Sequence, residues 1–191
     1  MPDPLSRALA ERLFSLDVTL PDAARPLVAG IATYGLVLVG LVLLAAAWAE
    51  ADRWTLRARL ADTAWIVLPA LIAAAVAVGL ANLLGALLPV SRPFVVLGHS
   101  PLFAWNADAS FPSDHVTLGV ALLAAPLRSH RAQAAILLLS LLVGAARIVA
   151  GVHWLADVVG AAVLGLLVAF IVRRAWVAAV QRPGRDPILT R

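Results

Sequence analysis

The sequence has 191 residues, of which 62% are hydrophobic and 14% charged, and its mean hydropathy is +0.94. Soluble domains average about 45–50% apolar and about 25% charged residues, so this composition excludes an ordinary soluble enzyme and favours an integral membrane protein. The absence of cysteine excludes a disulfide framework and a cysteine nucleophile. All 15 basic residues are arginines, scattered between apolar runs as membrane-flanking charges are, and not clustered as in a nucleic-acid-binding surface.

Along the chain, residues 1–26 carry leucines at helical spacing between charged residues. This pattern predicts an amphipathic helix in the membrane interface, or alternatively a sixth, poorly inserted span. Five apolar segments follow, the third and fourth of them short, and we expect each to be a membrane helix. The expected fold is an all-α membrane bundle in one domain of residues 1–180, followed by a flexible tail of residues 181–191. The predicted spans are 27–48, 63–88, 113–127, 132–150 and 153–174.

Charged side chains occur at the ends of these spans, where lipid makes them costly unless they are paired or hydrated. A single such charge is often part of a structural ion pair. Here, however, alternating crossings bring several of them to the same membrane face, which favours a functional site. These residues are Arg92 after the second span, His115 in the third, Arg147 in the fourth, and His153 and Asp157 in the fifth.

The other arginines orient the chain in the membrane. Most of them flank the face opposite the polar cluster, and the positive-inside rule makes that face cytoplasmic. The C-terminus is therefore expected in the cytoplasm and the polar cluster on the outer face. The opposite-face arginines are Arg53, Arg57, Arg59, Arg128, Arg131, Arg173, Arg174, Arg182, Arg185 and Arg191.

The residue types at the clustered face suit the transfer of a phosphoryl group. Arginine is a permanently charged, planar donor that matches phosphate oxygens, and the helix start at 112–115 offers backbone N–H groups to an anion. His153 and Asp157 are four residues apart and therefore on one helix face, where the carboxylate can hold the imidazole in one tautomer. The other ring nitrogen is then available as a nucleophile.

Two further residues complete this hypothesis. Arg147 precedes His153 by six residues, about 240° around an ideal helix, so the two can meet only if the helix breaks. Gly151 lies between them and permits such a break. His115 titrates in the range needed to protonate a leaving oxygen, which makes it a candidate general acid.

Three segments resemble the signature motifs of the type 2 phosphatidic acid phosphatase family, which read K-x6-R-P, P-S-G-H and S-R-x5-H-x3-D. More narrowly, they are similar to the bacitracin-resistance type of undecaprenyl diphosphate phosphatase, in which Asp commonly replaces the Gly of the second motif. The matching segments are Arg92-Pro93-Phe94, Ser110-Phe111-Pro112-Ser113-Asp114-His115, and Arg147-x5-His153-x3-Asp157.

The resemblance implies a metal-independent phosphatase, without a cofactor, that acts on a lipid substrate with a phosphate or diphosphate head group in a bacterial inner or plasma membrane. It implies that His153 is the nucleophile and forms a phosphohistidine, that Asp157 orients it, and that His115 protonates the leaving group. The implied ligands of the phosphoryl oxygens are Arg92, Arg147, Ser113 and Asp114, the last through its backbone amide.

The chain departs from the family pattern at two positions. Ala146 replaces the serine before Arg147, and Gly85 stands where the first motif requires lysine, a residue that the whole chain lacks. Phosphate binding then depends on the two arginines and the helix dipole, with Asn82 as an alternative donor from the same span. A weakened activity or a different substrate would also account for the missing lysine.

Undecaprenyl diphosphate is the substrate that the narrower resemblance favours. The alternatives are phosphatidic acid or phosphatidylglycerophosphate as the substrate, a metal-dependent enzyme, and a non-catalytic lipid-binding protein. The remaining polar and aromatic residues have simpler interpretations. Asp108 is interpreted as a loop-capping residue, and an aromatic belt at the membrane interfaces explains Trp48, Trp54, Trp65, Trp105, Trp154 and Trp176.

Overall fold

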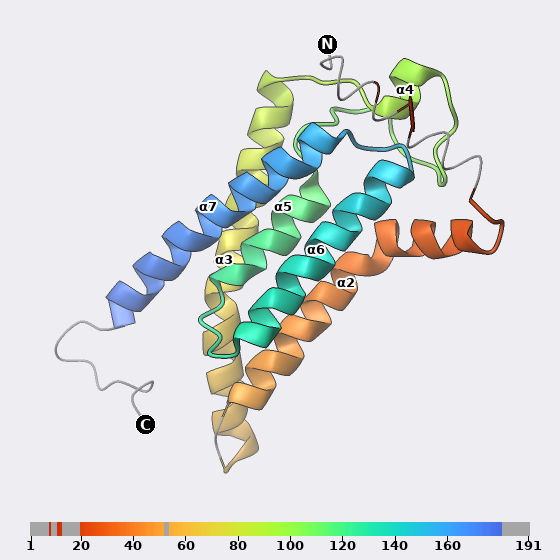
Figure 1. The fold of residues 1–191 in the computed structure, drawn as a ribbon. Helices are drawn as coiled ribbons and strands as arrows, with labels where there is room; N and C mark the ends of the chain where they lie inside the picture. Colours follow the sequence, from red (N-terminus) through yellow and green to blue (C-terminus); the bar gives the residue numbers. More distant parts are fainter. Residues whose placement is uncertain (1–7, 9–10, 13–19, 52–53, 181–191) are drawn as a thin grey trace.

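The computed structural model describes residues 8, 11–12, 20–51 and 54–180, and over these residues helices and loops form the all-α bundle expected from the sequence (Figure 1). Most of the predicted interfacial helix and all of the predicted tail lie outside the described residues. The elements are α2 (Ala24–Glu50), α3 (Leu56–Leu87), α4 (Pro93–Leu97), α5 (Asp114–Ala121), the 3₁₀ turn η1 (Leu122–Ala124), α6 (His130–Val149) and α7 (Leu155–Val180).

Four helices, α2, α3, α6 and α7, are long and apolar enough to cross a membrane. The third predicted span, 113–127, instead forms the shorter pair α5 and η1, which covers residues 114–124. Eleven residues reach about 17 Å, roughly half of a bilayer core of about 30 Å. Together with the loops before and after them, α5 and η1 still carry the chain from the end of the bundle near α4 to the turn before α6, so the alternating order of the polar residues is preserved (Figure 1).

The long helices extend beyond the charge-free runs from which the spans were predicted. Helix α3 begins at Leu56, before the predicted residue 63, because Thr55 Oγ1 caps it by accepting from the Ala58 N–H at 3.3 Å. Helix α7 likewise continues past Arg173 and Arg174 to Val180. Helix α2 begins at Ala24, so residues 24–26 belong to it and not to the predicted interfacial helix. The flanking charges therefore delimit the apolar segment of each of these helices, whereas the helix itself continues beyond them.

Helix α5 lies inside the bundle, in contact with α2, α3, α6 and α7 (Figure 1). Two glycines permit this close packing. A Cβ added at Gly144 of α6 would lie 2.9 Å from the Val116 side chain, and one at Gly165 of α7 would lie 2.9 Å from the Thr117 carbonyl oxygen. Because the neighbouring atoms at Gly165 are backbone and Cβ atoms of α5, this contact has little room to adjust.

The buried positions hold mostly small residues, whereas the outer faces hold large apolar ones. This distribution is typical of helices packed in lipid, where small side chains let backbones approach and the apolar exterior faces hydrocarbon. Fully buried alanines include Ala32, Ala47, Ala70, Ala73, Ala77 and Ala161. Exposed large residues include Val37, Leu41, Leu138, Leu167, Phe170 and Ile171.

The packing of α5 yields a stability prediction. We expect Gly165→Ala to destabilise the bundle by about 1–3 kcal/mol, because the new methyl group must push apart the α5 and α7 backbones. Thermal unfolding of the purified protein in detergent measures this effect. Gly79→Ala in α3 is the matched control, since nothing lies within 4 Å of its added Cβ. Equal unfolding temperatures for the two variants would contradict the packing described here.

Candidate active site

The polar residues meet at the end of the bundle where α6 stops and α7 begins. Helix α6 ends at Val149, and Gly151 takes a left-handed conformation with φ +79°, which favours glycine. The chain then turns back, and the Val152 N–H donates to the Arg147 carbonyl oxygen at 3.1 Å. The helix break expected at Gly151 is thus present. His153 lies in this break and not within α7, which corrects the predicted span of 153–174.

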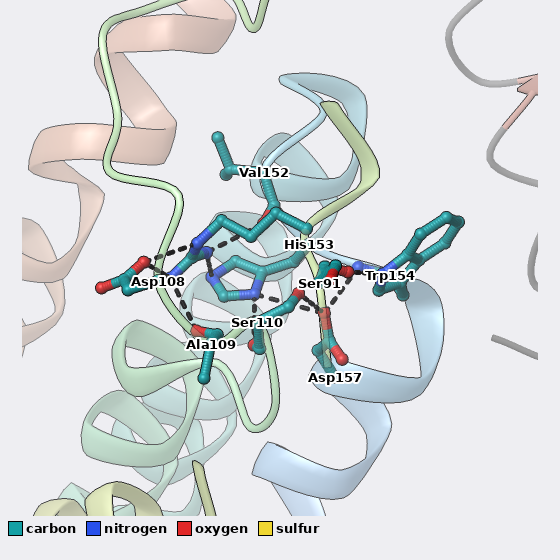
Figure 2. Close-up of polar contacts among 9 residues, drawn as sticks. Ser91, Asp108, Ala109, Ser110, Val152, His153, Trp154 and Asp157 are labelled. Carbon is teal, nitrogen blue, oxygen red and sulfur yellow. Dashed lines mark hydrogen bonds and ion pairs between the residues drawn. The ribbon is translucent and has the colours of Figure 1, made fainter. Parts of the chain in front are cut away.

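His153 is held by the backbone of Ser110 as well as by Asp157. Its Nδ1 lies 2.9 Å from the Ser110 carbonyl oxygen and 3.4 Å from Asp157 Oδ2 (Figure 2). A carbonyl oxygen only accepts, so Nδ1 carries the proton in this hydrogen bond. The Nε2 lone pair is therefore unprotonated in the neutral ring and faces Arg92 Nη1 at 3.4 Å.

Asp157 fixes the loop before α5 to the start of α7. Its Oδ2 accepts from the Trp154 backbone N–H at 2.7 Å and also from the Ser110 hydroxyl (Figure 2). Ser110 is fully buried and Asp157 is 1% exposed, so these bonds form away from water, where an unpaired carboxylate would be costly. Ser110 thus contacts both His153 and Asp157, a role that the sequence motif alone did not indicate.

Arg92, immediately before α4, is buried and donates hydrogen bonds to three residues. Its Nε and Nη2 both lie 2.8 Å from Asp108 Oδ1, and Nη1 and Nη2 donate to the carbonyl oxygens of Val152 and Ala109 at 2.9 and 3.0 Å (Figure 2). Asp108 is therefore an ion-pair partner of the site, where the sequence had suggested a loop cap. The other edge of the guanidinium remains directed at His153.

Arg147 and Ser113 have unused donors at the same end of the bundle. Arg147 is 1% exposed, and although its Nη1 donates to the Ala32 carbonyl oxygen at 3.0 Å, its Nε is buried without a hydrogen-bond partner. Ser113 is fully buried and its Oγ likewise lacks a partner. Buried donors of this kind are rare because they cost free energy, and an anion would satisfy them.

The start of α5 lies at the predicted anion-binding segment. Ser113 is the N-cap residue but uses no side-chain capping hydrogen bond, and Asp114 and His115 form the first turn. The Asp114 side chain is exposed, and its backbone N–H is one of the N–H groups of the first turn of α5. His115 packs against the edge of the Trp105 ring at 6.0 Å between centroids.

Trp105 and Trp154 belong to this cluster and not to an interfacial belt. Trp154 is 2% exposed, and its Nε1 donates to the Ser91 carbonyl oxygen at 2.8 Å. The Trp105 ring lies over the Arg147 guanidinium, with Cζ 4.4 Å from the ring centroid. Their sequence positions near span ends fit a belt equally well, so only the three-dimensional contacts distinguish the two interpretations.

Burial sets the protonation of His153. It lowers the pKa of the imidazole and outweighs the hydrogen bond to Asp157, which raises the pKa, and the charges of Arg147 and Arg92 lower it further. The ring is therefore neutral at neutral pH. A neutral imidazole with its proton on Nδ1 has the state that a nucleophilic Nε2 requires.

Gly85, the position of the missing lysine, lies beside the loop that carries Ser110. A Cβ added there would lie 3.2 Å from the Phe111 carbonyl oxygen and 3.6 Å from Ala109 Cβ. Asn82, the alternative donor, is exposed.

Among the described residues, no group of three or more His, Asp or Glu side chains is arranged to hold a metal ion.

Comparisons with known proteins identify the family of the chain. The PAP2 superfamily model matches residues 63–181, more than half of the chain. Undecaprenyl-diphosphatase BcrC of Bacillus subtilis (strain 168) is 38% identical over 81 residues, which are 42% of this chain and 42% of that protein. The putative undecaprenyl-diphosphatase YbjG of Escherichia coli (strain K12) is 34% identical over 161 residues, 81% of this chain and 76% of that protein.

A solved structure has the same fold. The crystal structure of a transmembrane PAP2 type phosphatidylglycerolphosphate phosphatase from Bacillus subtilis superimposes with a TM-score of 0.67 at 20% identity, over 94% of this chain and 90% of that one. The chain belongs to the PAP2 superfamily, and the class it falls in is that of integral membrane phosphatases, which are hydrolases. The family resemblance read from the three motifs is confirmed.

The contact between Phe111 and α7 yields a test of the site geometry. A Cβ added at Gly160 would lie 2.4 Å from Phe111 Cε2, so Gly160→Ala must displace the ring of Phe111, the residue that follows Ser110. We expect at least a tenfold loss of phosphatase activity, since Ser110 holds both His153 and Asp157. Gly30→Ala in α2, where nothing lies within 4 Å of the added Cβ, is the control. Unchanged turnover by the Gly160→Ala protein would disprove this role of the Phe111 contact.

Proposed function

We propose that the protein hydrolyses undecaprenyl diphosphate to undecaprenyl phosphate through a phosphohistidine on His153. The observation that carries the mechanism is the fixed imidazole, whose Nδ1 is bound by the Ser110 carbonyl oxygen while Nε2 faces a buried arginine. Support for the substrate comes from the names of two relatives, undecaprenyl-diphosphatase BcrC and putative undecaprenyl-diphosphatase YbjG.

In the proposed reaction, His153 Nε2 attacks the terminal phosphorus and the bond from phosphorus to the bridging oxygen breaks. His115, in its protonated form, donates a proton to that oxygen and becomes neutral, and undecaprenyl phosphate leaves. Water, deprotonated by the same His115, then attacks the phosphohistidine and releases inorganic phosphate, which leaves the free imidazole. Asp157 supports the imidazole throughout, because its carboxylate holds Ser110 and the first turn of α7 in place.

The phosphoryl oxygens are assigned to donors at the same end of the bundle as His153. Arg92 Nη1 is next to Nε2, and the unpartnered Arg147 Nε and Ser113 Oγ supply further donors. The Asp114 backbone N–H at the start of α5 adds the helix-dipole contribution. These groups stabilise the charge that develops on the transferred phosphoryl group, without a metal ion in the proposed step.

The membrane orientation is part of the same proposal. The distribution of arginines favours an orientation in which the site opens on the outer face and the C-terminus is cytoplasmic. Support for a bacterial inner or plasma membrane comes from the relatives in Bacillus subtilis and Escherichia coli. Lipid phosphates other than undecaprenyl diphosphate remain a second candidate substrate class, because the structural neighbour is named a phosphatidylglycerolphosphate phosphatase.

A panel of lipids tests the substrate. Purified protein without added metal should release phosphate from undecaprenyl diphosphate at least ten times faster than from phosphatidic acid or phosphatidylglycerophosphate, and orthovanadate should inhibit the release. The panel repeated with Gly85→Lys tests the missing lysine, whose Cβ must fit 3.2 Å from the Phe111 carbonyl oxygen. Faster release from phosphatidylglycerophosphate than from the diphosphate would overturn the substrate assignment, and no release from any lipid would support a lipid-binding protein.

The role of His153 has its own test. His153→Ala should lower turnover by at least 10⁴-fold, about the loss seen when a catalytic nucleophile is removed. Acid-labile phosphate retained on the protein after a rapid denaturing quench should also disappear. His130→Ala is the matched control, because His130 is an exposed histidine at the start of α6, at the opposite end of the bundle. Substantial turnover by His153→Ala would exclude the phosphohistidine mechanism.

A further inference from the structure

Trp105 contacts three side chains of the proposed phosphoryl site, although it comes from the loop between α4 and α5. Its ring centroid lies 4.4 Å from Arg147 Cζ, 5.7 Å from Arg92 Cζ and 6.0 Å from the His115 ring centroid. Phe103 packs edge-on against the same ring at 5.8 Å. The indole therefore lies where the two proposed phosphate-binding cations and the proposed acid come together.

The two arginines are held in different ways. Arg92 has an ion pair with Asp108 and two backbone carbonyl acceptors. Arg147 has one hydrogen bond, to the Ala32 carbonyl oxygen, and its Nε is buried without a partner. Besides that hydrogen bond, the Arg147 guanidinium lies against the Trp105 ring, with Cζ 4.4 Å from the ring centroid. Cation–π attraction is strongest where water is excluded, and Arg147 is 1% exposed.

A stacked arginine keeps its hydrogen-bonding edges free. A ring packed on the flat face of a guanidinium leaves accessible its edges, where phosphate oxygens bind in the plane of the group. The Trp105 ring therefore leaves the Nε edge of Arg147 available to an anion. The Trp105 Nε1–H is itself buried without a partner, as is Ser113 Oγ, so three unsatisfied donors accompany this stack.

Resting on the function proposed above, we propose that Trp105 is a positioning residue for phosphate binding. Its indole holds the Arg147 guanidinium so that the Nε edge is presented to the phosphoryl oxygens, and it covers the loop side of the site. The ligand class is a tetrahedral oxyanion, either the terminal phosphoryl group of a lipid or free inorganic phosphate. Lipid and inorganic phosphate are distinguished by measuring the lipid KM and the phosphate inhibition constant separately.

Kinetics of Trp105→Ala and Trp105→Phe test the proposal. We expect Trp105→Ala to raise the lipid KM and the inhibition constants of orthovanadate and phosphate about tenfold, with a much smaller change in kcat. Trp105→Phe, which keeps a ring but lowers the cation–π attraction, should fall between Trp105→Ala and the wild type. A purely structural role would lower kcat through a smaller active fraction and leave the inhibition constants unchanged. Constants within twofold of the wild type in Trp105→Ala would overturn the proposal.

Tryptophan fluorescence provides a second measurement that needs neither turnover nor the alanine variant. Orthovanadate or phosphate bound at the Arg147 edge should change the indole emission, and Trp105→Phe should abolish that change. Trp65→Phe is the matched control, because Trp65 packs against Trp176 at the opposite end of the bundle, 4.5 Å between centroids. An emission change that persists in Trp105→Phe would overturn the proposal. An emission change in a wild-type protein that hydrolyses no lipid would refute the proposed function and leave the role of Trp105 intact.

Discussion

The arrangement of the site depends on the hydrogen bonds of one buried carboxylate, that of Asp157. It accepts from the Trp154 N–H at the start of α7 and from the Ser110 hydroxyl, which lies just before α5. Ser110 and Trp154 both lie outside regular helices, so no helical hydrogen bonds hold these two residues in place. With the carboxylate buried at 1% exposure, losing either bond would leave charge unsatisfied in a site shielded from water. This constraint places the Ser110 carbonyl oxygen against His153 and so fixes the tautomer of the imidazole.

The break between α6 and α7 complements this constraint. A continuous helix would place Arg147 and His153 on different faces, whereas the left-handed Gly151 turns the chain back and leaves His153 outside regular helix. The free carbonyl of Val152 then accepts from Arg92, so the broken helix also organises the cation beside the imidazole. The residues of this break thus bring His153 Nε2 and the Arg92 guanidinium next to each other.

The surrounding bundle is built to bring polar groups close together inside an apolar protein. Glycines at the contacts of α5 let a short helix pack within the four long ones, and its first turn delivers Ser113 and His115 to the site. Large apolar side chains on the outer helix faces provide the contact with lipid. Buried polar groups at one end of such a bundle are costly, and the unpartnered donors of Arg147 and Ser113 are a cost consistent with anion binding.

The sequence by itself determined the all-α membrane class, the family, the helix break at Gly151 and the gathering of Arg92, Arg147, His153 and Asp157 at one end. These features depend on local hydropathy, on the conformational freedom of glycine and on the alternating direction of successive membrane crossings, and all three follow from the local sequence. The tertiary structure alone decided that Ser110 holds the imidazole, that Asp108 pairs with Arg92 and that Trp105 stacks on Arg147. Serine, aspartate and tryptophan at these positions are equally compatible with an ordinary loop or a membrane interface. Their roles depend on contacts between residues far apart in the sequence, which the hydrophobic periodicity of the chain does not predict. The tertiary structure also decided that α5 is short. Its apolar residues are buried by the other helices of the bundle and are not explained by contact with lipid.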